Sequence, residues 1–122
     1  MSELVFLCSS EQLQDSGTAV AFQVAYFGRH ESAFAVRFQG EVHAYLNRCS
    51  HVAMEMDYQP NNFFDSTGQW LMCATHGAMY DPSTGRCLMG PCRGGLIKID
   101  VAEAQGEVHW HTSDKFQPAL PP

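Results

Sequence analysis

Two short cysteine–histidine motifs are the residues of this chain best suited to chemistry. Cys49 and His51 are separated by one residue, and Cys73 and His76 are separated by two. Cysteine thiolates and imidazole nitrogens are both ligands of iron and zinc. The 21 residues between His51 and Cys73 are enough chain to bring two loops of one sheet together. The pattern therefore indicates a metal centre with four ligands from two loops.

The mixture of ligands within each motif distinguishes iron from zinc. Structural zinc sites usually take a pair of cysteines from one tight turn and further ligands from a second, with two to four residues between ligands. Here each motif has one cysteine and one histidine, which is unusual for zinc. It suits a dinuclear cluster, because two histidines can replace two cysteines on one iron of a [2Fe–2S] centre.

The flanking residues carry a resemblance to a known family. The segments that carry it are Asn47-Arg48-Cys49-Ser50-His51, Cys73-Ala74-Thr75-His76-Gly77-Ala78-Met79-Tyr80-Asp81, Thr84-Gly85 and Gly90-Pro91. Over about residues 42–101, the chain resembles the Rieske [2Fe–2S] family.

This resemblance implies one [2Fe–2S] cluster, with Cys49 and Cys73 on the inner iron and His51 and His76 on the outer iron. It also implies that Gly90-Pro91 forms a proline loop over the cluster, and that the fold is all-β, with three stacked antiparallel sheets and a cluster-binding subdomain.

Departures from the respiratory members of the family bear on the reduction potential. Those members join their cluster loops by a disulfide, but the matching residues here are Met54 and Thr75. They also place a serine, which hydrogen-bonds a cluster sulfide, where this chain has Ala78. Tyr80 stands at the position of a second hydroxyl donor, or is an aromatic core residue. Because hydrogen bonds to sulfur stabilise the reduced state, we expect a potential in the lower or middle part of the family's range.

The remaining cysteines and histidines have more ordinary interpretations. Cys87 and Cys92 could form a disulfide or pack beneath the proline loop, and packing is the favoured alternative. Cys8 is expected to be inert. The other four histidines have no cysteine at ligand spacing and are expected to face solvent from strands: His30, His43, His109 and His111.

Short strands separated by turns dominate the rest of the chain. β-branched and aromatic residues predict strands in five segments: 20–26, 33–38, 42–46, 70–73 and 107–111. Residues 96–101 alternate and predict a sixth, Gln39-Gly40 predicts a hairpin, and Asp81–Gly85 predicts a turn. A helical turn is possible near Glu11–Leu13. This pattern indicates an antiparallel sandwich or small barrel.

Two surface segments complete the organisation. Residues 59–68 form a loop with adjacent Phe63 and Phe64, which either cap the loop or offer a partner-docking surface. We expect one domain over residues 1–122, a cluster-binding part at about 47–92, and a proline-rich tail at about 117–122 that cannot continue a strand.

Composition narrows the possible partners and the compartment. The 122 residues carry seven Lys and Arg against thirteen Asp and Glu, for a net charge of −6. An acidic surface repels nucleic acid and anionic membranes and suits docking onto a basic protein. The first residues have no positive charge and only a short apolar run, which favours a cytoplasmic protein over an exported one.

The resemblance therefore implies an electron carrier between a flavin reductase and an oxygenase. Alternatives are the small subunit of a larger reductase, such as assimilatory nitrite reductase, a redox-sensing protein, or a structural zinc module. No catalytic site is evident, because the chain is too short for an oxygenase's mononuclear iron domain and shows no His-His-carboxylate triad.

Overall fold

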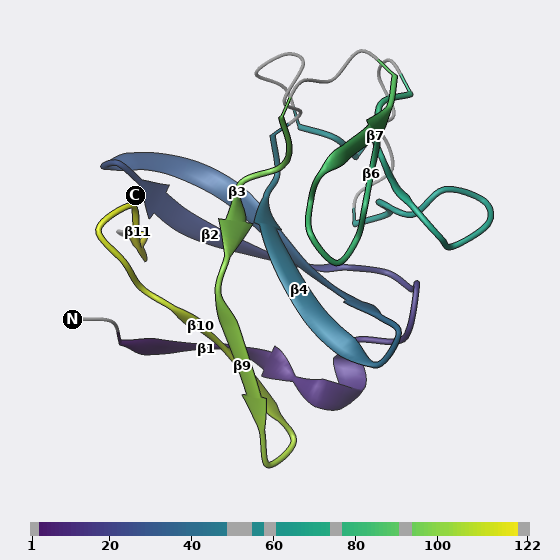
Figure 1. Ribbon diagram of the computed structural model, residues 1–122. Helices are drawn as coiled ribbons and strands as arrows, with labels where there is room; N and C mark the ends of the chain where they lie inside the picture. The colour runs from purple at the N-terminus through teal and green to yellow at the C-terminus, as the bar shows by residue number, and fades with distance from the viewer. Residues whose placement is uncertain (1–2, 49–54, 58–60, 74–76, 91–93, 120–122) are drawn as a thin grey trace.

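The computed structural model describes residues 3–48, 55–57, 61–73, 77–90 and 94–119, and within these ranges it is built from short strands with no α-helix (Figure 1). A 3₁₀ turn, η1, covers Ser10–Gln12, where a helical turn was expected. The strands are β1 (Leu4–Ser9), β2 (Val20–Tyr26), β3 (Arg29–Phe38), β4 (Glu41–Leu46), β5 (Leu71–Met72), β6 (Met79–Tyr80), β7 (Cys87–Met89), β8 (Lys98–Ile99), β9 (Val101–Ala104), β10 (Glu107–His111) and β11 (Phe116–Pro118).

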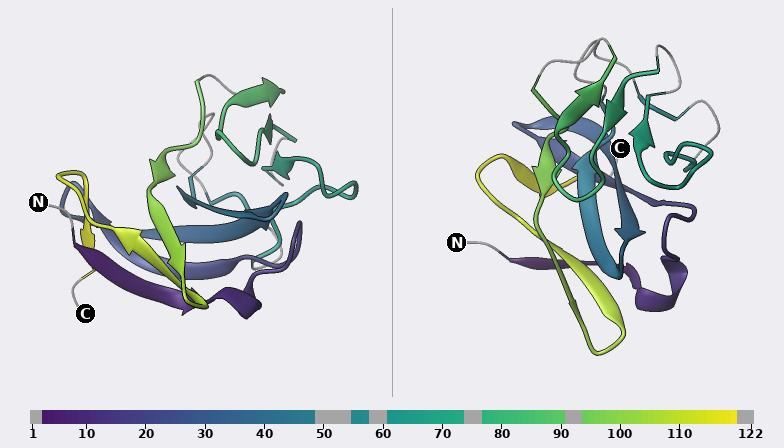
Figure 2. Two further views of the ribbon diagram at one scale, coloured as in Figure 1. Left: turned by 60° about the horizontal axis from the view of Figure 1, so that its bottom comes forward. Right: turned by 45° about the vertical axis from the view of Figure 1, so that its right-hand side comes forward.

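These strands form three antiparallel sheets, as the resemblance implied. Sheet A has the order β1-β10-β9, sheet B the order β11-β2-β3-β4-β8, and sheet C the order β5-β6-β7. In the left view of Figure 2 the sheets lie in layers, with sheet B between sheets A and C. The expected all-β sandwich is confirmed.

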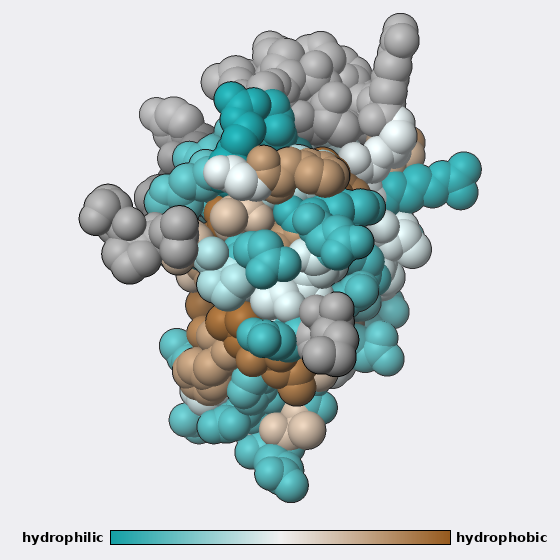
Figure 3. Space-filling view, turned by 90° about the vertical axis from the view of Figure 1, so that its left-hand side faces the viewer, coloured by the Kyte–Doolittle hydropathy of each residue, from teal (hydrophilic) through white to brown (hydrophobic). Residues whose placement is uncertain are grey.

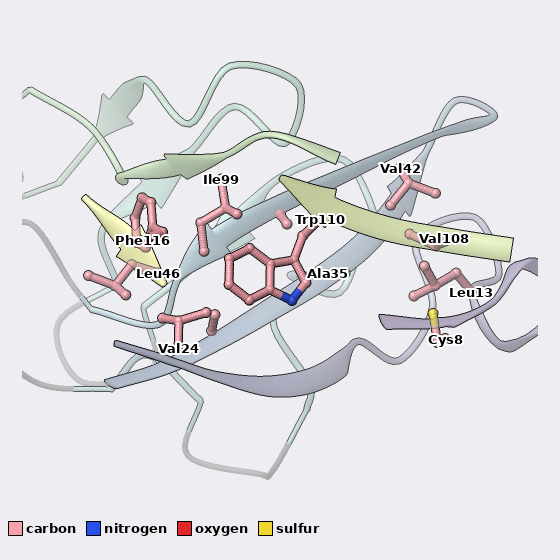
Figure 4. Close-up of a cluster of buried hydrophobic side chains, with 12 residues drawn as sticks. Cys8, Leu13, Val24, Ala35, Val42, Leu46, Ile99, Val108, Trp110 and Phe116 are labelled. Carbon is pink, nitrogen blue, oxygen red and sulfur yellow. The ribbon is translucent and has the colours of Figure 1, made fainter. Parts of the chain in front are cut away.

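The alternation of side chains along β3 explains why sheet B occupies the middle layer. Ala33 and Ala35 point into a core shared with sheet A, whereas Phe34 and Val36 point into a core shared with sheet C. Successive strand residues face opposite sides of a sheet, so a strand with both faces covered is apolar throughout. Figure 4 shows the first core, with Trp110 of β10 at its centre.

Two-residue turns with positive φ join the strands of sheet B. The predicted hairpin turn at Gln39 and Gly40 is confirmed, with φ of 52° and 85°. Phe27 and Gly28 make a second such turn between β2 and β3. Positive φ at both positions gives a turn whose twist matches that of the flanking strands.

Two of the strand expectations are wrong. The segment 96–101 is not one strand, because β8 pairs with β4 in sheet B whereas β9 pairs with β10 in sheet A. Asp100 is thus the point where the chain passes between layers. The tail was expected to contain no strand, but β11 ends at Pro118 on the edge of sheet B, where a missing N–H costs no ladder hydrogen bond.

Sheets A and B are also joined by a charged pair. The Arg37 guanidinium of β3 contacts the Glu103 carboxylate of β9, with Nη1 3.0 Å from Oε1. The same guanidinium donates from Nε to the Leu13 carbonyl at 2.8 Å. The pairing raises the pKa of Arg37 and lowers that of Glu103.

The loop 59–68 turns its aromatic residues inward. Phe63 is buried and stacks on Phe34, with ring centroids 3.7 Å apart, and Phe64 stacks on Phe38. The alternative in which the loop is capped by its own aromatic residues is confirmed for Phe63. Among the described residues, none lies in a helix long and apolar enough to cross a membrane.

Candidate metal centre

One of the four candidate ligands, Cys73, lies within the described residues. Its side chain is fully buried in the core between sheets B and C. Cys49, His51 and His76 lie outside the described residues, so their assignment as ligands stays a prediction. The residues that flank them show how each ligand segment begins and ends.

The second ligand segment, residues 73–76, follows β5 and precedes β6. Two backbone hydrogen bonds connect the residues at its two ends. The Cys73 N–H donates to the Ala78 carbonyl at 2.8 Å, and the Gly77 N–H donates to the Cys73 carbonyl at 2.9 Å. Gly77 has φ of 74°, a conformation that glycine adopts without steric cost. The ends of the segment are therefore fixed immediately beside the expected ligands Cys73 and His76.

The first ligand segment, residues 49–51, follows β4. The side-chain amide of Asn47, before this segment, is hydrogen-bonded to residues that come after it. Asn47 Nδ2 donates to Asp57 Oδ1, and Asn47 Oδ1 accepts from the Met56 N–H, both at 2.8 Å. Asp57 Oδ2 in turn accepts from the Asn61 N–H at 2.8 Å. The sequence pattern assigns Asn47 no role of its own. Its position directly after a buried strand and before the first motif was the available signal.

Residues that flank the two segments meet in one core. Met56 follows the first segment, while Cys73 and Ala78 flank the second, and all three are fully buried in the same hydrophobic cluster. Tyr80 is also fully buried there, which agrees with a core aromatic residue; its role as a hydroxyl donor stays a prediction. Since residues that flank both segments pack in this cluster, the expected ligands are connected to one buried core.

The predicted turn at Asp81–Gly85 is confirmed and anchors sheet C to sheet B. The Tyr45 hydroxyl of β4 donates to the Pro82 carbonyl at 2.7 Å. Burial raises the pKa of Tyr45, so this hydroxyl stays protonated and remains a donor. A Cβ at Gly85 would lie 2.7 Å from Tyr45 Cε1, which explains why this turn needs glycine.

Cys87 corrects an expectation from the sequence. It is half-buried in β7 and is disulfide-bonded, so the preference for simple packing is wrong for this residue. Cys92 and Pro91 lie outside the described residues. Gly90, which precedes Pro91, does lie against the second ligand segment, because a Cβ there would come within 2.9 Å of Ala78 Cα.

The remaining cysteine and histidines divide between the core and the surface. Cys8 is buried, and desolvation raises the pKa of its thiol, which agrees with an inert side chain. His30 is exposed, and His109 and His111 are half-buried. The expectation that His43 faces solvent is wrong, because its side chain is only 7% exposed.

The residues around Cys73 fit an iron–sulfur cluster. A thiolate is the ligand that such clusters take from proteins, and here one is placed at the base of a hydrogen-bonded loop in an apolar core. Within the described ranges no three His, Cys, Asp or Glu side chains form a metal-binding group. A complete site therefore needs the expected ligands of the two remaining segments.

Comparisons with known proteins agree with an iron–sulfur cluster. The model of the Rieske [2Fe–2S] domain matches residues 3–102, whereas no curated protein matches the chain. The ferredoxin of carbazole 1,9a-dioxygenase from Nocardioides aromaticivorans IC177 is similar in structure, with 26% identity and a TM-score of 0.69, over 88% of this chain and 95% of that one.

Two other solved structures share the fold at lower identity. The Sphingomonas yanoikuyae B1 ferredoxin has 22% identity and a TM-score of 0.71, over 91% of this chain and all of its own. The terminal oxygenase of carbazole 1,9a-dioxygenase from Nocardioides aromaticivorans IC177 has 22% identity and a TM-score of 0.69, over 98% of this chain but 34% of that one.

The family match covers most of the chain, and the three-sheet architecture agrees with it. The expected cofactor, one [2Fe–2S] cluster, is that of the matched domain. The chain therefore belongs to the Rieske [2Fe–2S] domain family.

Proposed function

We propose that this protein is a one-electron carrier that takes an electron from a flavin reductase and passes it to an oxygenase. The observation that carries the proposal is Cys73, a buried thiol at the start of a closed loop, within a chain that matches the Rieske domain from residue 3 to residue 102. The similarity in fold and length to two ferredoxins, one of them the ferredoxin of a dioxygenase, supports a carrier.

In this proposal four side chains hold the cluster. Cys49 and Cys73 bind one iron as thiolates, and His51 and His76 bind the other as neutral imidazoles. The bound cluster takes up and releases one electron. Two ferric ions, two sulfides and two thiolates carry no net charge together, so an added electron meets no negative charge on the site. This is the electrostatic reason why histidine ligation raises the potential to roughly −150 to +300 mV, from about −400 mV with four cysteines.

The protein's own residues supply support and insulation. Asn47 joins the ends of the first segment, and the Cys73–Ala78 hydrogen bond joins those of the second. The buried residues around Cys73 exclude water from the thiolate side of the site. Because a preorganised site changes little on reduction, this support keeps the cost of electron transfer low.

The first experiment is analysis of the anaerobically purified protein. We expect two irons and two acid-labile sulfides per chain, a reddish-brown colour, and an axial low-g paramagnetic signal after reduction. A flavin reductase should reduce the protein reversibly, and the reduced protein should give its electron to an oxygenase. A colourless zinc protein would contradict the cluster, and a stable complex with a large flavin or haem subunit would instead make it a reductase subunit.

Ligand assignment is tested by His51→Cys, with His30→Cys as the matched control. A thiolate in place of an imidazole adds negative charge to the site, so the His51 variant should keep its iron and have a lower potential. His30 is exposed on β3, and its variant should keep the wild-type spectrum and potential. An unchanged spectrum and potential in the His51 variant would refute the proposed ligand set.

A cytoplasmic location is part of the same proposal. It is supported by the similarity in structure to ferredoxins. Cell fractionation with an antibody against the protein should find it with cytoplasmic markers, and its recovery with exported proteins would contradict this.

A further inference from the structure

We propose that Cys87 and Cys92 form a thiol-reducible disulfide that holds residues 87–92 against the second ligand segment and slows loss of the cluster. The part that concerns the cluster rests on the proposed function. The choice of Cys92 rather than Cys49 as the partner also uses the proposed function, whereas the disulfide of Cys87 itself is independent of it. The disulfide and the cluster are tested separately below.

The pairing follows from which cysteines are accounted for. The chain has five cysteines. Cys87 is disulfide-bonded, whereas Cys8 and Cys73 form no disulfide, so Cys49 and Cys92 are the two candidate partners. A cysteine in a disulfide has no thiolate to give to iron, and Cys49 is a proposed ligand. Cys92 is therefore the partner that is compatible with a bound cluster.

The path of the backbone supports the same partner. The Cys87 N–H donates to the Gly94 carbonyl at 2.9 Å, and Arg86 is bridged to Gly95. The chain thus turns back on itself between residues 87 and 94. Cys92 lies two positions before Gly94 in the sequence, and a disulfide between Cys87 and Cys92 requires that their Cα atoms lie about 4.4–6.8 Å apart.

The segment closed by this disulfide touches the ligand loop. Gly90 has φ of 91°, and a Cβ there would lie 2.9 Å from Ala78 Cα and 3.2 Å from the Gly77 carbonyl oxygen. Gly77 and Ala78 are also the residues whose hydrogen bonds to Cys73 close that loop. A continuous series of backbone contacts therefore links the disulfide to the loop that holds Cys73 and His76.

Reduction of the disulfide is a two-electron reaction, distinct from the one-electron reaction of the cluster. A thiolate of a low-molecular-weight thiol or a dithiol protein attacks one sulfur and forms a mixed disulfide; a second thiol then releases it. The protein gains two thiols, with two electrons and two protons, and the reductant becomes a disulfide. Cys87 is half-buried rather than enclosed, and disulfides in a cytoplasmic protein are exposed to such thiols.

Opening the disulfide should loosen the hold on the cluster. Closing a short loop by a disulfide restricts the opened state of that loop. With two thiols in its place, residues 87–92 can leave Ala78 more often, and the second ligand segment opens with them. We expect the cluster to be lost on the order of tenfold faster in the thiol form.

Peptide mapping tests the disulfide directly. Trypsin cleaves after Arg86 and Arg93 and so releases both cysteines in one peptide, residues 87–93. From protein purified without thiols, we expect this peptide to lack two hydrogens and to take up iodoacetamide only after treatment with dithiothreitol. Alkylation without prior reduction would overturn the disulfide. A cross-link to the peptide of residues 49–86, which contains both Cys49 and Cys73, would overturn the pairing and one of the two proposed cysteine ligands.

The rate of cluster loss tests whether the disulfide stabilises the bound cluster. In the presence of an iron chelator, wild-type holoprotein should lose its visible absorbance faster with dithiothreitol than without it. The double variant Cys87→Ser/Cys92→Ser should lose its absorbance at the faster rate whether or not dithiothreitol is present. Cys8→Ser is the control, because Cys8 is buried in the core of sheets A and B, and it should respond to dithiothreitol as the wild type does. If wild-type loss is unaffected by the reductant, the stabilising role is overturned, even if the disulfide forms.

One further outcome would distinguish failure of the proposed function from failure of the disulfide proposal. A protein that contains no iron–sulfur cluster, but gives the oxidised 87–93 peptide, would contradict the electron carrier and leave the disulfide in place.

Discussion

His43 is a buried histidine on β4 whose Nδ1 has no hydrogen-bond partner among the described residues. Desolvation, and then the positive charge of Lys98, lower the pKa of His43, against the opposing effects of Glu41 and Asp81. The folded protein therefore favours the neutral imidazole. In the unfolded chain this side chain titrates near its ordinary value of about 6.5.

This difference predicts a dependence of stability on pH. Well above about pH 6.5 His43 is neutral in both the folded and the unfolded state and contributes no slope. As the pH falls from 6.5 towards the folded-state pKa, the unfolded chain takes up a proton first. The free energy of unfolding should then decrease, by at most about 1.4 kcal/mol per pH unit for one proton. His43→Gln should flatten the urea-unfolding midpoint against pH, whereas exposed His30→Gln should keep the wild-type slope.

Comparison of slopes isolates His43 from the proposed ligands His51 and His76, because the wild type and both variants contain these two residues unchanged. Equal slopes in the wild type and His43→Gln would show that burial of this imidazole does not control acid stability.

Ala78 offers a second test at the residue scale. It is fully buried beside Cys73 and occupies the position where the respiratory members of the family have serine. Ala78→Ser should raise the midpoint potential, because a hydroxyl donor to a cluster sulfide stabilises the reduced form. Redox titration followed by visible absorbance measures this shift. The control Ala102→Ser, on β9 of sheet A, should leave the potential unchanged. If Ala78→Ser has the same potential as the wild type, the lack of a hydroxyl donor at this position does not lower the potential.

At the scale of elements, the contact between β7 and the second ligand segment can be tested with two matched glycines. Gly90 and Gly94 both have positive φ, but only Gly90 would place a Cβ against backbone, 2.9 Å from Ala78 Cα; nothing lies within 4 Å at Gly94. Both Gly→Ala variants bear the strain of a left-handed residue, about 1 kcal/mol. Gly90→Ala must also displace the ligand segment, so it should lose its cluster faster than Gly94→Ala does.

The measurement is chelator-dependent bleaching of the two holoproteins under the same conditions. Equal rates would show that the close approach of Gly90 to Ala78 has no part in holding the cluster.

Elements with local signals could be predicted from the sequence, and those set by distant contacts could not. The bounds of β2 agree with the prediction, and Gln39-Gly40 forms the predicted turn. The division of residues 96–101 between two sheets depends on the partners of β8 and β9, which alternation along one segment does not encode. The same holds for His43, whose strand has both faces covered, so the usual assumption of a solvent-facing strand histidine fails.

In the candidate site, too, some features could be predicted from the sequence and others could not. Motif spacing predicts the ligand types, because cysteine and histidine at such spacing are typical of a metal site, and that prediction concerns three residues outside the described ranges and the described Cys73. The support from Asn47 and the disulfide of Cys87 needed the folded structure, since asparagine and cysteine occur in many other roles.

In the whole molecule sheet C lies on one side of sheet B, and sheet A lies on the other (Figure 2). The face shown in Figure 3 has hydrophilic side chains around smaller hydrophobic areas. The net charge of −6 applies to the oxidised holoprotein, since the oxidised cluster is neutral as a unit, and it becomes −7 on reduction. The molecule therefore approaches any partner as an anion, and more strongly so when it carries an electron.

This charge predicts how electron transfer depends on salt. A basic docking face on the partner would attract the acidic carrier over a distance that shrinks with ionic strength, with a Debye length of about 10 Å at 0.1 M and about 3 Å at 1 M. The second-order rate constant with such a reductase or oxygenase should therefore fall as salt is added, by an amount up to the 10–10³-fold typical of steered association. Stopped-flow absorbance measures it, with reduction by a small uncharged reductant as the control that salt should barely affect. A partner rate that rises with salt would mean that the docking face repels this protein, and the acidic surface would then not guide the encounter.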